Sequence, residues 1–136
     1  IHCPGNNRFF GRVPFPVDAY SRAGVHLALG TDSLASNDDL DMRREMALLR
    51  EAAPALSPGR LWHMATLGGA RALGWEGTVG RLRAGWRADL ALFEVSATSS
   101  AGVLDELTAG RPALRRSWVN GGELRRHARD PSPSGR

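Results

Sequence analysis

The sequence predicts an α/β fold, in which helices alternate with buried parallel strands. A helical pattern over residues 17–22 is followed by Gly24 and then by the apolar run Val25 to Leu29. Near-continuous apolar character is typical of a parallel strand that is buried on both faces. A short polar turn follows, and a second helical pattern begins near Asp38. This order of elements is typical of an α/β barrel or of a doubly wound sheet.

Caps and breakers predict the remaining elements of the first half. Residues 2–16 are rich in proline, glycine and asparagine, which predicts a loop. Asp38, or the residue before it, can cap the helix that ends at Pro54. The Ser57-Pro58 pair is typical of a helix start. The apolar pattern then continues as one helix, or as two short helices broken near Gly68-Gly69.

After residue 74, short turns and strands replace the helices. A strand is predicted over 90–95, a weak helix over 99–108, and a strand over 117–122 that enters an Asn-Gly hairpin turn with 123–125 as its partner. The chain therefore divides into three parts. These are an α/β part over 1–74, a β-rich part over 75–127, and a polar Pro/Ser tail over 128–136 that is expected to be disordered.

Composition excludes several classes of protein. All 18 basic residues are arginine, so the chain has no P-loop lysine, Schiff-base lysine or carbamylated-lysine metal bridge. The net charge of +4 comes from an excess of arginine in residues 111–136, without the interleaved aromatic residues of a nucleic-acid platform. No apolar run approaches the ~18 residues of a membrane span. A single cysteine, Cys3, and the lack of a secretory signal predict a cytoplasmic protein that binds neither nucleic acid nor membrane.

Asp32 is the first candidate for chemistry. It follows the predicted strand in the stretch LGTDSLASN, residues 29–37. A carboxylate at the C-terminal end of a buried strand lies where α/β proteins build their sites. Such a residue could bind a metal and act as a general base, or it could cap the next helix. The residues alone leave both interpretations open.

Five ordered motifs carry a resemblance to a known family. They are HCPGNN (2–7), LGTDSLASNDDLDMRREM (29–46), MATLGGARALG (64–74), VGRLRAGWRADLALFE (79–94) and SWVNGGEL (117–124). They resemble metal-dependent amidohydrolases, in the branch of chlorohydrolases and of guanine, cytosine and adenosylhomocysteine-type deaminases. The resemblance implies the C-terminal part of a (β/α)8 barrel of the TIM type, about strands 7 and 8 with the following helices, over 1–74. It implies part of a small β-sandwich domain over 75–127.

The resemblance also implies roles for individual residues. Asp32 would bind the catalytic metal and exchange a proton with its water. His2 would lie near substrate at the mouth of strand 7, or it would be a histidine without such a role. Asn7 fits the family's pattern and would contact substrate or brace the loop, whereas Asn6 stands where serine is usual. Ser36 would contact substrate, or it would cap the following helix.

The implied cofactor is a divalent metal, zinc first and iron second. A mononuclear site of this family takes about four protein ligands, mostly histidine. The four histidines of the chain are widely separated, with no His-x-His pair. The histidine ligands are therefore expected outside this chain, and the isolated chain is expected to be inactive. Of the other polar residues, Cys3 is expected to be a buried thiol, Glu45 to form an ion pair or a packed surface, and Asp89 to tie a turn.

The function that the resemblance implies is hydrolysis of a C–N bond, or of a C–Cl bond, on a purine, pyrimidine or triazine-like ring. Deamination of aminated purine nucleosides is favoured. The partners would be a small-molecule substrate and either a second copy of the chain or a missing N-terminal barrel segment. The alternative is a non-catalytic remnant, or a structural module that folds only with a partner, because histidine ligands are absent and a truncated barrel has open sheet edges.

Overall fold

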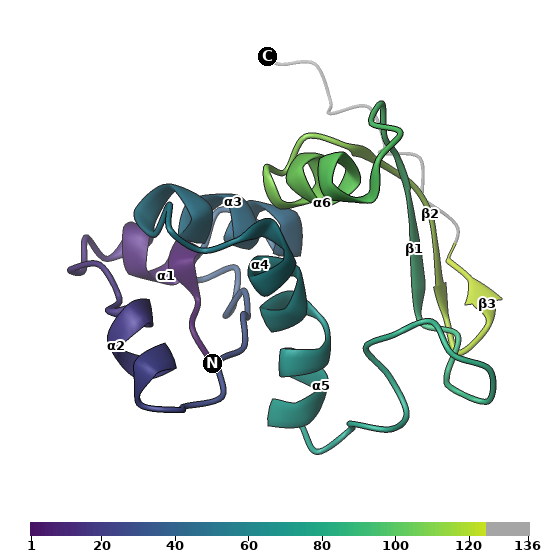
Figure 1. Cartoon of the computed structure of the whole chain (residues 1–136), viewed down its shortest axis with the longest axis horizontal. Coiled ribbons are helices and arrows are strands. Elements are labelled where there is room, and N and C mark those ends of the chain that lie inside the picture. The colour runs from purple at the N-terminus through teal and green to yellow at the C-terminus, as the bar shows by residue number, and fades with distance from the viewer. Residues whose placement is uncertain (125–136) are drawn as a thin grey trace, which may run out of the picture.

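The computed structural model describes residues 1–124 of the chain. Within these residues, a helical part and a sheet are joined by helix α6, which packs against α3 and α4 (Figure 1). The elements in chain order are α1 (Pro4–Phe9), α2 (Val17–Arg22), α3 (Met42–Ala52), α4 (Pro58–Ala65), α5 (Leu67–Ala72), β1 (Leu90–Glu94), α6 (Ser100–Thr108), β2 (Ala113–Val119) and β3 (Gly122–Glu123).

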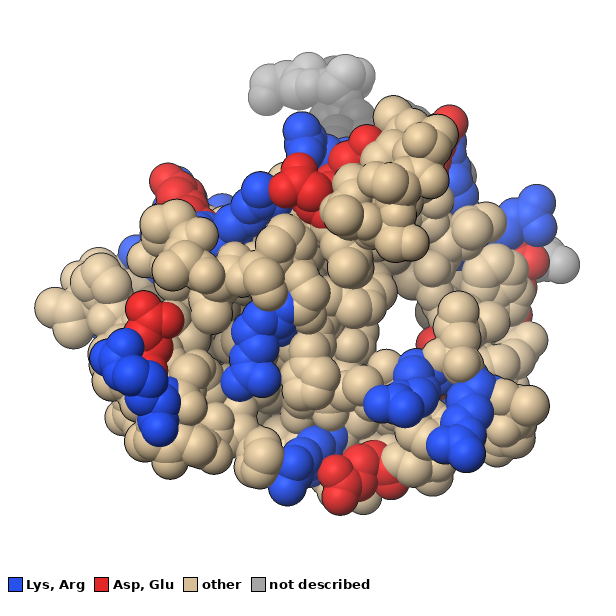
Figure 2. All heavy atoms as spheres, in the orientation of Figure 1, with Lys and Arg blue, Asp and Glu red and all other residues tan. Residues whose placement is uncertain are grey.

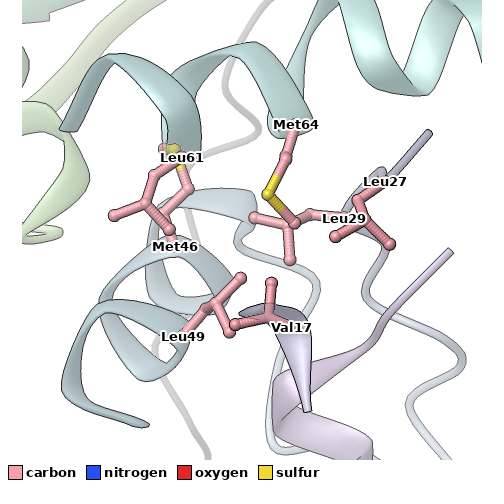
Figure 3. Close-up of a cluster of buried hydrophobic side chains, with 7 residues drawn as sticks. All are labelled: Val17, Leu27, Leu29, Met46, Leu49, Leu61 and Met64. Atoms are coloured by element: carbon pink, nitrogen blue, oxygen red, sulfur yellow. The ribbon is translucent and has the colours of Figure 1, made fainter. Parts of the chain in front are cut away.

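The core of the helical part is a cluster of buried apolar side chains from α2, α3, α4 and the segment before the Asp32 turn (Figure 3). Met46 and Leu49 are three residues apart on α3, as are Leu61 and Met64 on α4, so each pair lies on one face of its helix. The cluster consists of Val17, Leu27, Leu29, Met46, Leu49, Leu61 and Met64.

Within residues 1–124, Val25 to Leu29 does not form the predicted strand. Leu27 and Leu29 are buried as predicted, but the segment makes only an isolated parallel bridge, between His2 and Leu29. The His2 N–H donates to the Ala28 carbonyl at 2.9 Å, and the Gly30 N–H donates to the His2 carbonyl at 3.0 Å. On its other side, the Leu29 N–H donates to the Met64 carbonyl at the end of α4. A strand requires a ladder of such bonds, which one bridge does not make.

The predicted loop over 2–16 contains a helix, α1, which begins at Pro4. Proline is favoured in the first turn of a helix because its missing N–H would have no partner there, so Pro4 is a start signal rather than a breaker. The next helix, α3, begins at Met42 instead of Asp38, because Asp41 is its cap and accepts from the Arg43 N–H at 2.9 Å.

The helix after Ser57-Pro58 begins as predicted, with the Ser57 hydroxyl accepting from the Arg60 N–H at 3.2 Å. It breaks at Thr66, which ends α4 and precedes α5, and not at the glycines. Gly68 lies inside α5. A Cβ at this position would stand only 2.6 Å from the Leu27 carbonyl oxygen, so a larger residue would not fit here without a shift. The glycine therefore allows α5 to pack directly on the buried segment.

The sheet confirms the predicted hairpin. It is antiparallel in the order β1-β2-β3, with an irregularity in register between Leu92 and Phe93. Asn120 and Gly121 both have positive φ, 50° and 80°, as a two-residue turn of this type requires. The second strand begins earlier than predicted, at Ala113. Helix α6 forms as predicted, with Ser99 as its cap.

Side chains of α3 also tie the helical part to the sheet. Arg43 donates to the Pro112 carbonyl just before β2, and its guanidinium lies 5.2 Å from the centre of the Phe93 ring on β1. Figure 2 shows an opening between the helices and the sheet, and arginine and acidic side chains interspersed on this face. No helix among residues 1–124 is both long and apolar enough to cross a membrane. The predicted tail over 128–136 lies outside the described residues.

Candidate active site

Asp32 stands exposed on the turn that follows the buried Leu27–Leu29 segment. Its φ of 57° is in the left-handed region, which aspartate tolerates better than most residues. One carboxylate oxygen, Oδ2, accepts from the Asn6 side-chain amide at 2.7 Å, and the other, Oδ1, accepts from the Ser33 N–H at 2.8 Å. The carboxylate is thus held at both oxygens and still faces solvent.

The buried carboxylate of Glu45, on α3, connects this turn to α1 by hydrogen bonds. Glu45 has no exposed surface and accepts from the Gly5 N–H at 2.7 Å and from the Asn37 side-chain amide at 2.6 Å. The same Asn37 amide donates to the Thr31 carbonyl at 2.7 Å. Glu45 therefore takes hydrogen bonds from amides, where an ion pair or a packed surface was predicted.

Gly5 is required by the same hydrogen bonds. A Cβ at this position would stand 2.4–2.5 Å from the side-chain atoms of Asn37 and Glu45. Sequence reasoning missed Gly5 and Glu45 as site residues and treated Asn6 as a departure from a pattern. The available signal was a carboxylate, Glu45, placed on the face of α3 that also carries the apolar Met46 and Leu49.

His2 and Asn7 line a pocket of about 350 Å³, together with Phe15. The His2 ring is buried and stacks on Phe15, with 4.4 Å between ring centres. Burial lowers the pKa of His2 below its ordinary value of 6.5, so its ring is neutral at pH 7. Asp32 is not among the residues that line this pocket. His2 and Asn7 thus line one pocket, whereas Asn6 donates a hydrogen bond to Asp32, which does not line that pocket.

Ser36 is buried within the Asp32 turn. Its hydroxyl lies 3.4 Å from the Ser33 carbonyl, to which it donates. The alternative role as cap of the following helix is wrong, because Asp41 caps α3. Asp89 ties a turn as predicted, since its carboxylate accepts from the Asn120 N–H at 2.7 Å.

Cys3 lies close to the carboxylates of the site. Burial raises the pKa of its thiol, and the nearby charges of Asp32 and Glu45 raise it further. The thiol is therefore protonated at neutral pH and is a poor nucleophile. Cys3 is half-buried, where a buried thiol was predicted.

Within residues 1–124, no group of three or more histidine, cysteine, aspartate or glutamate side chains could hold a metal ion. His26 and His63 line a second pocket, of about 310 Å³, together with Arg60, Arg71 and Trp86, and Asp32 is not part of it. Asp32 could supply one ligand of a metal site that needs several. A carboxylate that accepts two hydrogen bonds keeps further lone pairs for a cation.

Comparisons of the sequence and of the structure with known proteins identify related hydrolases. The sequence profile of the Amidohydrolase family matches residues 1–121. A 5-methylthioadenosine/S-adenosylhomocysteine deaminase from Halobacterium salinarum is 40% identical over 115 residues, which cover 79% of this chain and 26% of that protein.

Two enzymes are among the solved structures that resemble the chain. One is an adenosine deaminase from Xanthomonas campestris with bound zinc (TM-score 0.79, 37% identity, covering 90% of this chain and 30% of that one). The other is a mutant of atrazine chlorohydrolase from Arthrobacter aurescens, complexed with zinc and atraton (TM-score 0.70, 29% identity, covering 90% and 30%). The chain thus spans 26% to 30% of the length of these three relatives.

Proposed function

Because this chain belongs to the amidohydrolase family, we propose that it forms the C-terminal part of a metal-dependent deaminase in which Asp32 acts at the catalytic centre. The observation that supports this most directly is the exposed Asp32 carboxylate, held by Asn6 and Ser33 on a turn after a buried segment. The names of the H. salinarum and X. campestris relatives, both deaminases, support the same class of reaction.

The proposal takes residues 1–74 as the end of a (β/α)8 barrel, with the His2 segment as strand 7 and residues 25–29 as strand 8. The parallel bridge between His2 and Leu29 supports this assignment, because neighbouring barrel strands are parallel. Asp32 would then stand at the C-terminal end of strand 8, on the face where barrel enzymes carry their active sites.

The proposed cofactor is zinc, with iron as the second candidate, because two solved relatives hold zinc. Asp32 would supply one carboxylate ligand, and the histidine ligands would come from outside this chain. The chemistry that such a cation supplies when bound is acidification of water and polarisation of the substrate.

The proposed reaction exchanges an amino group on a ring carbon for the oxygen of water. The Asp32 carboxylate takes a proton from the attacking water as the C–O bond forms, and returns it to the amino nitrogen as the C–N bond breaks. One water is consumed, one ammonia is released, and the ring carbon becomes a carbonyl, so no oxidant or reductant is needed. Asn6 and Ser33 keep the carboxylate oriented during both proton transfers.

The proposed substrate is an aminated purine nucleoside, the class that the names of two relatives contain. The neutral His2 ring and Asn7, which share a pocket, would contact the substrate, and Ser36 would shape the turn beneath it. A chlorinated triazine is the second candidate, since one solved relative is a chlorohydrolase. In that case water would displace chloride in place of ammonia.

The Asp32→Asn substitution in the complete protein that contains this chain tests the proposal. We expect it to lower kcat for ammonia release from adenosine or S-adenosylhomocysteine by roughly 10²- to 10⁴-fold, the typical contribution of a general acid-base residue. Asp18→Asn, on the exposed side of α2, is the matched control and should leave kcat unchanged.

Full activity of the Asp32→Asn protein would show that Asp32 is not catalytic. A zinc-loaded wild-type protein that releases neither ammonia nor chloride from any of these rings would favour the alternative, a non-catalytic remnant or a partner-dependent structural module.

A further inference from the structure

We propose that Asn6 is a positioning residue that orients the Asp32 carboxylate, and that the buried Glu45 determines where Asn6 stands. This inference rests on the proposed function, because Asp32 is the group that is positioned. It goes beyond that function in naming which side chains give the carboxylate its orientation.

The contact between Asn6 and Asp32 joins two segments that are 26 residues apart, with 2.7 Å between the amide nitrogen and Oδ2. A carboxylate accepts only, so the donor end of the Asn6 amide must face it. Together with the Ser33 N–H on Oδ1, the contact restrains rotation about the carboxylate's last torsion, which is otherwise broad. Two lone-pair positions remain for a cation and for a proton.

A series of hydrogen bonds through Glu45 holds the segment that carries Asn6. The N–H of the preceding residue, Gly5, donates to Glu45, which is 40 residues away and fully buried. Glu45 also accepts from Asn37, whose amide reaches the carbonyl of Thr31, the residue before Asp32. The peptide bonds Gly5–Asn6 and Thr31–Asp32 close this circuit, so Asn6 and Asp32 are fixed relative to one another on both sides.

The Asn6 side chain is long enough for its amide to reach the Asp32 carboxylate from a different segment of the chain. The Asn6 amide is also neutral and does not titrate, so it holds Asp32 without exchanging protons with it. In this proposal Asp32 moves the proton, and Asn6 orients the carboxylate that carries it. A misdirected catalytic group loses rate much more readily than it loses substrate binding.

The test uses the complete, zinc-loaded protein with Asn6→Ala, Asn6→Ser and Asn6→Asp. We expect Asn6→Ala to lower kcat by about 10-fold or more, with a smaller change in KM, and to weaken zinc binding by about 10- to 100-fold, as loss of a residue that orients a ligand does. Asn6→Asp has the same size but faces Asp32 with an acceptor, so it should lose at least as much kcat. Asn6→Ser should lie between Asn6→Ala and the wild type.

Zinc affinity, measured by competition with a chelator, is the readout that does not depend on turnover. Asn120→Gly is the matched control: it removes an amide side chain at a hairpin position with φ of 50°, where glycine is tolerated, and should change neither kcat nor zinc affinity. Glu45→Gln should reproduce the Asn6→Ala pattern if it folds. If it does not fold, the Asn6 variants alone decide the question, because Asn6 is only half-buried.

Wild-type kcat and zinc affinity in Asn6→Ala would overturn the inference. If the wild-type protein binds zinc but releases no ammonia, the proposed reaction fails while the zinc comparison between Asn6→Ala and the wild type still tests the positioning role. If the wild-type protein binds no zinc or iron, both proposals fail together.

Discussion

At the scale of single residues, the two carboxylates of the site have opposite environments. Asp32 is exposed and held by one side-chain amide and one backbone N–H, whereas Glu45 has no exposed surface and accepts from Gly5 and Asn37. A buried carboxylate is stable only when donors surround it, and here the donors lie on the two segments that carry Asp32 and Asn6. Burial and exposure thus separate a structural acid from a candidate catalytic one.

His2 provides a pH-dependent prediction at this scale. Burial lowers its pKa below 6.5 in the folded chain, so the unfolded chain binds a proton first as the pH falls. The stabilisation that His2 contributes is therefore present above pH 6.5 and is lost as the pH falls through the folded pKa. We expect the free energy of unfolding to fall more steeply between about pH 7 and about pH 5 for the wild type than for His2→Gln.

Urea titrations at a series of pH values measure this difference. His63→Gln, which replaces an exposed histidine on α4, is the matched control. Parallel curves for the wild type and His2→Gln would contradict the prediction.

At the scale of elements, close approach of backbones explains the first of the two consecutive glycines in α5 but not the second. Gly68 faces the buried segment, where a Cβ would stand 2.6 Å from the Leu27 carbonyl and 3.1 Å from the His63 carbonyl. Gly69 has nothing within 4 Å of the same position. Backbone atoms cannot move aside as the end of a flexible side chain can, so only the first glycine is required by packing.

The pair Gly68→Ala and Gly69→Ala tests this difference. We expect Gly68→Ala to lower the free energy of unfolding by about 1–3 kcal/mol through overpacking. Gly69→Ala should raise it by about 0.5–1 kcal/mol, because alanine is the better helix former. Chemical denaturation of the two variants measures both changes, and equal effects of the two substitutions would refute the packing argument.

At the scale of the whole molecule, α6 connects the sheet to the helical part by apolar burial and by ion pairs. Leu107 is 7% exposed, and α6 packs against α3 and α4. Asp105 on the same helix pairs with Arg50 of α3 at 2.6 Å and with Arg111 at 2.9 Å, but all three side chains are more than a third exposed. Exposed ion pairs contribute little because water screens them, so the apolar contact should dominate.

Leu107→Ala and Asp105→Asn compare the two contributions. Leu107→Ala should lower the free energy of unfolding by about 2–4 kcal/mol, in the range of buried leucine truncations. Asp105→Asn should lower it by no more than about 1 kcal/mol at moderate salt. Thermal or urea unfolding gives both values, and a larger effect for Asp105→Asn would mean that the ion pairs hold the two parts together.

Features that depend on near neighbours along the chain could be predicted from the sequence alone. The Ser57 cap depends on a side-chain bond to a backbone N–H three residues away, and the Asn120-Gly121 turn depends on the positive φ that these two residues tolerate. Two other local signals led to wrong predictions, because Pro4 begins α1 and Asp41, not Asp38, caps α3. Sequence patterns predict these features because few other parts of the molecule affect them.

Which residues meet across the site depends on tertiary packing and could not be predicted from the sequence. Asn6 reaches Asp32 over 26 positions and Glu45 reaches Gly5 over 40, and no periodicity in the sequence relates these pairs. Likewise, the 25–29 segment has the composition of a strand, but its hydrogen-bond partners determine its structure, and here they are a single bridge to His2 and the end of α4. Long-range contacts of this kind depend on how the whole chain packs, which local propensity does not specify.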